Sequence, residues 1–366
     1  MIRDRMRRKY LISLAAVLLC MCLTACEEKP SILKAEPITA SGETSGADLG
    51  STGKAAGAEN DAQNSVDKKD AKGESSADGE KTTRSASSEE NVAADAKDPL
   101  QGTPLTEGTV STVKLLQKDG TTLETRVQAP SGYERVEVEE GSFEEFLRQY
   151  PMKPDGAKVH LYDGSEKGNQ SAHVAVFDLP IEDYDLQQCA DSVMRMYAEY
   201  FWATEQYDRI KFHFTNGFLV EYTKWRDGNR ITVSGNNVSW IKSKSKDTSY
   251  DCFVRYLKTI FCYAGTLSME KESEPTLLSL LKAGDVFLYG GSPGHVVMVV
   301  DACVNEEGKK AFLLAQGYMP AQEFHLLKND LHPEDPWYYE DEITFPFDTP
   351  EYVFQEGCMR SLSYDQ

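Results

Sequence analysis

The sequence predicts an α+β fold in which helices pack on an antiparallel sheet within a single domain. The chain has 37 aromatic residues, and all of them except Tyr10 lie at or beyond Tyr133. A segment of more than a hundred residues without an aromatic side chain cannot build a packed core. Beyond it, helical patterns come first and strand patterns follow, an order typical of α+β proteins. We therefore expect one globular domain over residues 109–366.

Three segments of this domain have helical patterns. Ser142 and Glu145 form a capping box that predicts a short helix ending near residue 150. Apolar residues recur at helical spacing over residues 185–202, with Asp185 as the predicted cap. A third helix is expected over residues 250–264, where Gly265 ends it.

The remaining patterns are those of β-strands. Alternating or continuous apolar runs bounded by glycine and polar residues predict short strands. They cover residues 172–179, 210–214, 218–225, 230–233, 286–289, 295–301 and 311–316. The last three follow one another closely, so we expect them to form an antiparallel sheet.

The N-terminus has the pattern of a bacterial lipoprotein signal. Five basic residues among the first ten precede an uncharged run over residues 11–25. This run is shorter than the roughly 20 residues of a membrane span, which favours a signal peptide over residues 1–25. Leu23-Thr24-Ala25-Cys26 resembles a lipobox. The resemblance implies that Cys26 carries lipid and holds the protein on the exported side of the cell membrane or outer membrane.

Residues 26–108 are predicted to be the lipidated cysteine followed by a disordered tether. Residues 27–100 contain 16 acidic and 9 basic residues, many Ala, Gly and Ser, and no aromatic side chain.

The whole chain has a formal charge of −20, and no basic stripe follows residue 10. Nucleic acid is excluded as a partner, because phosphate binding requires clustered Lys and Arg.

Five cysteines remain once the signal peptide is removed and Cys26 is lipidated. They are Cys189, Cys252, Cys262, Cys303 and Cys358. An odd number leaves at least one free thiol in the exported domain. No spacing of Cys and His residues indicates a metal site, and we expect no metal and no other cofactor.

Cys189, His295 and Gln316 are the candidate catalytic residues. Cys189 lies in the first turn of the helix predicted over residues 185–202, where the macrodipole is expected to lower the thiol pKa. His295 follows a Gly-Gly-Ser-Pro-Gly loop and begins a strand, and Gln316 ends the next one. If these strands pair, the Gln316 amide oxygen would orient the imidazole beside a nucleophilic thiol. Such a thiolate would react with iodoacetamide faster than Cys262 or Cys303.

The sequence contains further candidate residues beside these three. Gln188, Ser292, Trp225 and Gln322 are candidate substrate-binding residues. Cys252 is the second candidate nucleophile, because Asp251-Cys252-Phe253-Val254 resembles a phrase of the NlpC-type enzymes without its Ser-Gly pair. The alternative for Cys189 and His295 is that both are packing residues of the core.

The order of these segments resembles the CHAP amidohydrolases and the NlpC-type cell-wall peptidases. Both have a Cys on a helix, a Gly-His-Val strand start and a polar residue on the next strand. The resemblance implies a papain-like fold, cleavage of amide bonds in peptidoglycan peptides, and catalysis by Cys189, His295 and Gln316. The separation of Cys189 from His295 is longer than usual in those families, so an inserted β segment is expected over residues 210–245. The third position is usually acidic, Asn or His.

The domain also resembles a bacterial lipoprotein family known as domain-of-unknown-function family 4846. The phrases that carry this resemblance are LYDG at 161, QQCAD at 187, FTNGF at 214, YAGTLS at 263, GGSPGH at 290 and LAQGYMPAQ at 314. The family implies no established activity. The sequence therefore favours a lipid-anchored cysteine hydrolase of cell-wall peptides, with an inactive wall-binding or interaction lipoprotein as the alternative.

The lipobox interpretation is tested by Cys26→Ser. We expect this variant to leave the membrane fraction, because it removes the residue that would carry the acyl chains. Mass spectrometry of the mature wild-type protein should find lipid on Cys26 at its N-terminus. Cys22→Ser, within the signal peptide, is the matched control. An unmodified Cys26 in the mature protein would refute the assignment.

Overall fold

A nine-stranded sheet is the centre of the computed structural model, which describes residues 114–365. The predicted signal peptide and tether, residues 1–108, lie outside the described residues. The strand order is β2-β11-β10-β9-β8-β15-β7, with β1 paired to β9 and β12 paired to β10. All of these pairings are antiparallel. The predicted α+β class is confirmed.

The helices and strands are short apart from α4, α6 and β9. The helices are α2 (Leu123–Arg126), α3 (Phe143–Arg148), α4 (Cys189–Ala203), α5 (Tyr222–Arg226), α6 (Tyr250–Tyr263) and α7 (Thr266–Lys271). The first eight strands are β1 (Tyr133–Arg135), β2 (His173–Val176), β3 (Lys211–His213), β4 (Leu219–Glu221), β5 (Asn229–Ser234), β6 (Asn237–Lys242), β7 (Ser273–Pro275) and β8 (Val286–Tyr289). The others are β9 (His295–Asn305), β10 (Lys310–Gln316), β11 (His325–Leu327), β12 (Tyr338–Tyr339), β13 (Phe347–Thr349), β14 (Tyr352–Phe354) and β15 (Met359–Leu362). Between residues 114 and 365, none of the helices is long and apolar enough to cross a lipid bilayer.

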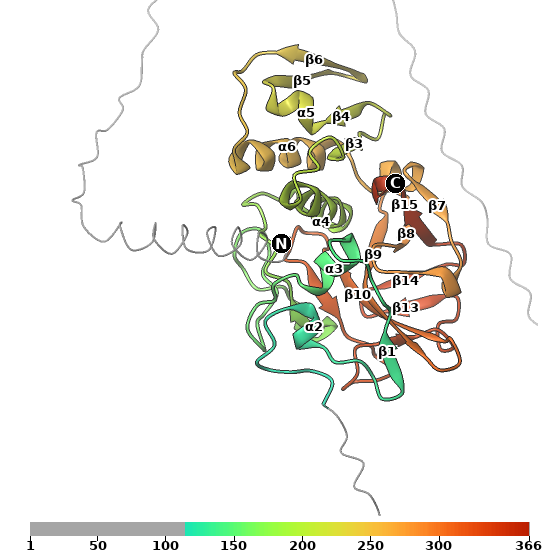
Figure 1. Cartoon of the computed structure of the whole chain (residues 1–366). Helices are drawn as coiled ribbons and strands as arrows, with labels where there is room; N and C mark the ends of the chain where they lie inside the picture. Colours follow the sequence, from blue (N-terminus) through green and yellow to red (C-terminus); the bar gives the residue numbers. More distant parts are fainter. Residues whose placement is uncertain (1–113, 366) are drawn as a thin grey trace, which may run out of the picture. The chain divides into compact units, whose positions relative to one another are not determined.

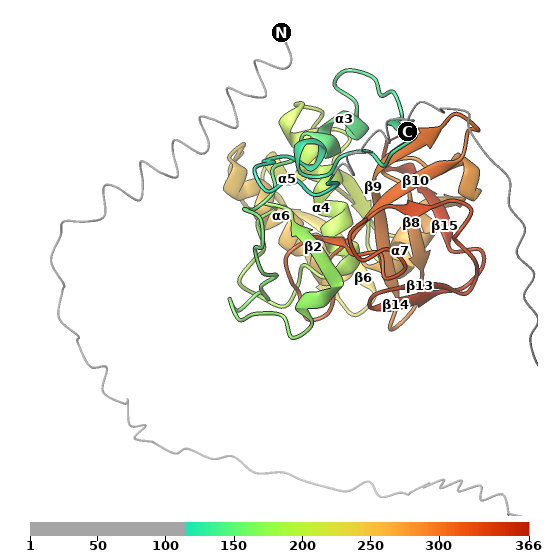
Figure 2. The ribbon, with the colours of Figure 1, turned by 90° about the horizontal axis from the view of Figure 1, so that it is seen from below.

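Strand β9 is buried on both faces and divides the apolar interior into two cores. Val296 and Met298 belong to the core that contains α4 and α6. Val297 and Val299 belong to the core beneath the β13–β14 hairpin. Figure 1 shows the helices on one side of β9 and the hairpin on the other, and Figure 2 shows the same layers from below. The uninterrupted apolar run of β9 reflects this double burial.

Helix α4 begins four residues later than the sequence predicts. Its cap is Gln188, whose backbone N–H donates to an Asp191 carboxylate oxygen at 3.0 Å. The Asp185 carboxylate, predicted as the cap, instead accepts from the Gln188 side chain at 3.1 Å and from the Ala321 N–H at 2.7 Å. Asp185 therefore ties the chain before α4 to the loop after β10, and Cys189 becomes the first helical residue.

The segment expected as an insertion forms two separate hairpins, β3–β4 and β5–β6, joined by α5. A strand was predicted over residues 218–225, but its second half is α5. Tyr222 and Trp225 are three residues apart and both are buried, as on one face of a helix. The Trp225 indole N–H donates to the Cys252 carbonyl of α6 at 3.1 Å. Packing against α6 therefore overrides the strand preference of these aromatic residues.

Asp301 links β9 to β1 and α3 through a buried ion-pair network. Its carboxylate is fully buried and accepts from Arg135 and from Arg148, each at 2.7 Å. The Ala302 N–H donates to it as well, at 2.9 Å. The strand predicted over residues 295–301 ends at Asp301, whereas β9 continues to Asn305. The structure shows at Asp301 a charge that is paired on two sides inside the domain.

Asp301→Ala is expected to lower the free energy of unfolding by about 3 kcal/mol, because it leaves two arginines without their buried partner. Urea denaturation of the purified protein measures this loss. Asp330→Ala removes an exposed carboxylate paired with Lys328 at 3.5 Å and should change stability by less than about 0.5 kcal/mol. Equal midpoints for the two variants would contradict the structural role of Asp301.

Candidate functional site

The N-terminus of α4 meets the start of β9, and Cys189 lies at this junction. Only 6% of the Cys189 surface is exposed. The backbone N–H groups of Cys189, Ala190 and Val296 lie close enough to favour the thiolate form of the sulfur. Val296 directly follows His295, so the junction brings two of the predicted catalytic residues to the same end of β9.

The thiol does not have the lowered pKa that its position in the helix predicts. Burial, together with a smaller effect of the nearby Asp191 carboxyl, raises the pKa of Cys189 to about 11. The three N–H groups act in the opposite direction but are outweighed. Asp191 is itself buried, which raises its own pKa to about 8. The thiol is therefore protonated at neutral pH in this structure.

His295 and Gln316 form the hydrogen bond that strand parity predicts. The distance between His295 Nε2 and Gln316 Oε1 is 2.7 Å. The orientation of the amide follows from its other end, where Gln316 Nε2 donates to a Glu351 carboxylate oxygen at 2.9 Å. An amide oxygen only accepts, so the proton of the neutral imidazole lies on Nε2 and Nδ1 carries the lone pair. Burial lowers the pKa of His295 to about 4.

Aromatic side chains enclose the imidazole. The ring centroids of Tyr352 and Tyr318 lie 4.7 and 4.8 Å from that of His295, and Phe354 stacks at 6.0 Å. His295 is 3% exposed as a result. The ring lies on the face of β9 that packs against β14, whereas Cys189 belongs to the helix-side core. Within residues 114–365, the Cys189 thiol and the His295 imidazole are not joined by a hydrogen bond.

Gly317 allows β10 and α4 to approach closely at this point. A Cβ atom on Gly317 would lie 2.4 Å from the Ser192 hydroxyl and 2.9 Å from the Gln188 carbonyl oxygen. Because glycine has no such atom, the chain after Gln316 passes directly against the first turn of α4. This close approach places Gln316 at the same junction as Cys189.

Glu351 is a member of the site that sequence reasoning missed. It lies in the turn between β13 and β14, next to Tyr352. Burial by itself would raise its pKa, but the neighbouring His325 and Lys167 outweigh this effect and lower the pKa to about 2. The phrase Asp-Thr-Pro-Glu around it has the composition of an exposed turn, so the sequence carried no signal for this role.

Two of the four candidate substrate-binding residues are near the junction. Gln188 caps α4 immediately before Cys189, and Ser292 is exposed in the loop that leads into His295. Gln322 is 1% exposed, and its Nε2 donates to the Pro320 carbonyl at 3.0 Å. Trp225 is buried beneath Arg230, whose guanidinium lies 4.2 Å from its ring, and packs on α6. The prediction of a substrate-facing Trp225 is therefore wrong, because the indole completes the core between α5 and α6.

Cys252, the second candidate nucleophile, is a core residue. It is fully buried in the first turn of α6, and burial raises its thiol pKa. All five cysteines of the described domain are free thiols. Within residues 114–365, no group of His, Cys, Asp and Glu side chains is arranged to hold a metal ion.

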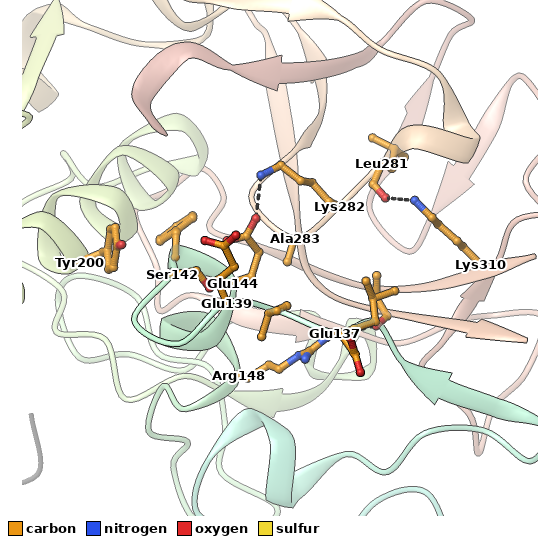
Figure 3. A pocket seen from close by; sticks show the side chains of 14 residues that line it. Glu137, Glu139, Ser142, Glu144, Arg148, Tyr200, Leu281, Lys282, Ala283 and Lys310 are labelled. Atoms are coloured by element: carbon orange, nitrogen blue, oxygen red, sulfur yellow. Dashed lines mark hydrogen bonds and ion pairs between the residues drawn. The ribbon is translucent and has the colours of Figure 1, made fainter. Parts of the chain in front are cut away.

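A pocket of about 470 Å³ lies at the opposite end of α4 from Cys189. Its walls come from α3, from Tyr200 near the end of α4 and from residues 281–283 before β8. Figure 3 shows the Lys282 ammonium pointing to Glu144, at 2.7 Å, and Lys310 donating to the Leu281 carbonyl, at 2.9 Å. The basic side chains that line it are thus engaged by groups of the wall itself.

The comparisons with known proteins identify the family of this domain. A family model described as domain of unknown function (4846) matches residues 123–361. The chain belongs to this family. The family-4846 domain runs from α2 to β15 and contains Cys189, His295, Gln316 and Glu351. The searches of curated proteins and of solved structures gave no match. The resemblance to CHAP and NlpC-type enzymes stays a prediction.

Iodoacetamide labelling tests the protonated state of the thiol. In the folded protein near pH 7.5 we expect the exposed Cys262 to react first, and Cys189 to react at least about tenfold more slowly, because few of its molecules are thiolates. This order reverses the expectation from the sequence. Peptide mass spectrometry over a time course measures both rates, with Cys262→Ser as the control. Faster labelling of Cys189 would show that its pKa is lowered after all.

Proposed function

We propose that this protein is a lipid-anchored, papain-like cysteine hydrolase that cleaves amide bonds in peptidoglycan peptides. The observation that carries the proposal is the His295–Gln316 hydrogen bond at the junction where Cys189 begins α4. A nucleophile at a helix N-terminus, a base on a strand and a polar group that orients the base are the parts that cysteine-dependent amide hydrolysis needs.

In the proposed mechanism, His295 Nδ1 accepts the thiol proton while the Cys189 sulfur attacks the carbonyl carbon of the substrate. The backbone N–H groups at the start of α4 stabilise the resulting oxyanion. The C–N bond then breaks, and the imidazolium gives its proton to the leaving amine. Water, deprotonated by His295, hydrolyses the thioester and releases the acid, which restores the thiol and the neutral imidazole.

The proposal includes a movement that opens the site. Cys189 and His295 are each less than 10% exposed, and Tyr318 and Tyr352 cover the imidazole. In this closed form the imidazole and the thiol share no hydrogen bond, so the movement has to do two things: displacement of the two tyrosines by a peptide would expose the ring, and it would let the imidazole turn towards the Cys189 thiol. Tyr318 lies in the loop after β10, and Tyr352 is the first residue of the short hairpin strand β14. Loops and the ends of short hairpins move more readily than the central strands of the sheet.

The alternative is an inactive papain-like lipoprotein that binds cell-wall peptides. Two observations favour this alternative: one argues against hydrolysis by the closed form, and the other argues for binding of a ligand. The thiol pKa of about 11 makes Cys189 a weak nucleophile in the closed form, whereas the exposed Tyr289, Met319 and Ser292 near the start of β9 offer groups for contact with a ligand.

Digestion of purified peptidoglycan by the mature full-length protein tests the proposal. We expect newly released amino groups with the wild type, and a loss of at least about a thousandfold with Cys189→Ala. Cys262→Ala is the matched control and should retain activity. Hydrolysis that survives in Cys189→Ala would refute Cys189 as the nucleophile. Binding to peptidoglycan without turnover, unchanged in Cys189→Ala, would establish the alternative.

A further inference from the structure

We infer that Glu351 is a positioning residue that sets the proton position and the basicity of His295 through the side chain of Gln316. The side chain of Gln316 has two polar atoms, and each of them forms a hydrogen bond with a different residue. Its Oε1 accepts from His295 Nε2 at 2.7 Å, and its Nε2 donates to Glu351 Oε2 at 2.9 Å. The Gln316 side-chain amide is fully buried, and a flip that exchanges its oxygen and nitrogen would break both hydrogen bonds.

The charge of Glu351 fixes the donor and the acceptor in each of the two hydrogen bonds that link Glu351, Gln316 and His295. Burial alone would raise its pKa, but His325 and Lys167 lower it to about 2, so it is a carboxylate at neutral pH and only accepts hydrogen bonds. The Gln316 NH₂ group must therefore face Glu351, and the Gln316 oxygen must face His295. The imidazole is left with one way to satisfy that oxygen, which is to carry its proton on Nε2. Nδ1 is then the basic nitrogen, the one that the proposed reaction uses.

The carboxylate is itself held from the other side. The Lys167 ammonium, which is buried, donates to Glu351 Oε2, and Asn169 Nδ2 donates to Oε1 at 3.2 Å. His325 Nδ1 donates to the Glu323 carbonyl at 2.8 Å, and its Nε2 lies 3.3 Å from the Lys167 ammonium and 3.8 Å from Glu351 Oε2. A buried cation thus compensates the carboxylate, and both have partners. The result is a directed series from Lys167 through Glu351 and Gln316 to His295.

Glu351 also compensates in part for the lack of charge on glutamine as the residue that orients the imidazole. An amide oxygen is uncharged and stabilises an imidazolium less than a carboxylate does. Glu351 raises the pKa of His295 from one side chain away, against the larger effect of burial. The other charged or titratable groups that face the ring are Lys167, His325, Tyr318 and Tyr352, and none of them is an anion at neutral pH.

The inference about the proton position stands on the folded protein alone, whereas its consequence for catalysis rests on the proposed function. The two are tested separately. Nitrogen-15 spectra of the histidine rings in the mature full-length protein report which ring nitrogen carries the proton. His295→Gln identifies the His295 signals by their absence. In the wild type we expect the Nε2–H tautomer. A wild-type ring protonated on Nδ1 would overturn the inference without any further variant.

Glu351→Gln keeps the size of the side chain and removes the charge that fixes the Gln316 amide. We expect the single His295 tautomer to be replaced by a mixture, and the His295 pKa to fall. Glu342→Gln is the matched control, because Glu342 contacts His332 Nε2 at 2.7 Å elsewhere on the domain. It should change the His332 signals and leave those of His295 as they are. An unchanged tautomer and pKa of His295 in folded Glu351→Gln would overturn the inference.

The double variant Gln316→Glu/Glu351→Gln moves the carboxylate one position along the series. We expect it to restore the Nε2–H tautomer and to raise the His295 pKa above the wild-type value, because the anion then contacts the ring directly. A role of Glu351 in folding alone would not produce this rescue, so a folded double variant that fails to restore the tautomer contradicts the inference.

If the protein hydrolyses peptidoglycan, Glu351→Gln should lower kcat by roughly tenfold or more with little change in KM. Absence of hydrolysis in the wild type would refute the proposed function and leave the tautomer result standing.

Discussion

Burial of β9 on both faces is the constraint on which the rest of the domain depends. A strand with an apolar surface on each side needs a cover on each side, and here α4 with α6 supplies one and the β13–β14 hairpin supplies the other. The first residue of this strand is His295, so the two covers meet around it. Cys189 arrives from the helix side, while Tyr352 and Phe354 arrive from the hairpin side.

The same burial explains the polar chemistry of the site. Ionisable groups in an interior of low polarity must be paired or neutral. Asp301 meets this requirement with two arginines, and Glu351 meets it with Lys167 and the Gln316 amide. Cys189 and His295 meet it by staying neutral, with pKa values moved to about 11 and about 4. A hydrolase built on this site would therefore separate charge only when substrate has opened it, which links its proposed activity to the movement of Tyr318 and Tyr352.

Local patterns predicted the parts of the fold that local forces decide. The α3 cap at Ser142 and the end of α6 before Gly265 were predicted, as was the whole of β8. Strand parity also predicted that Gln316 would reach His295, because the alternation of side chains leaves few choices once two strands pair. The start of α4, the helix α5 and the burial of Trp225 were not predicted. Each depends on a partner distant in the chain, namely Ala321 for Asp185 and Cys252 for Trp225.

The sequence by itself determined the α+β class, the family, and the pairing of His295 with Gln316 at one end of β9. These follow from periodicity, capping and short phrases, all of which are written in neighbouring residues. Only the tertiary structure decided the protonation of the site and the part that Glu351 plays in it. A pKa depends on the solvent and charges that surround a group in space, and those surroundings come from segments as far apart as Lys167, Gln316 and Glu351.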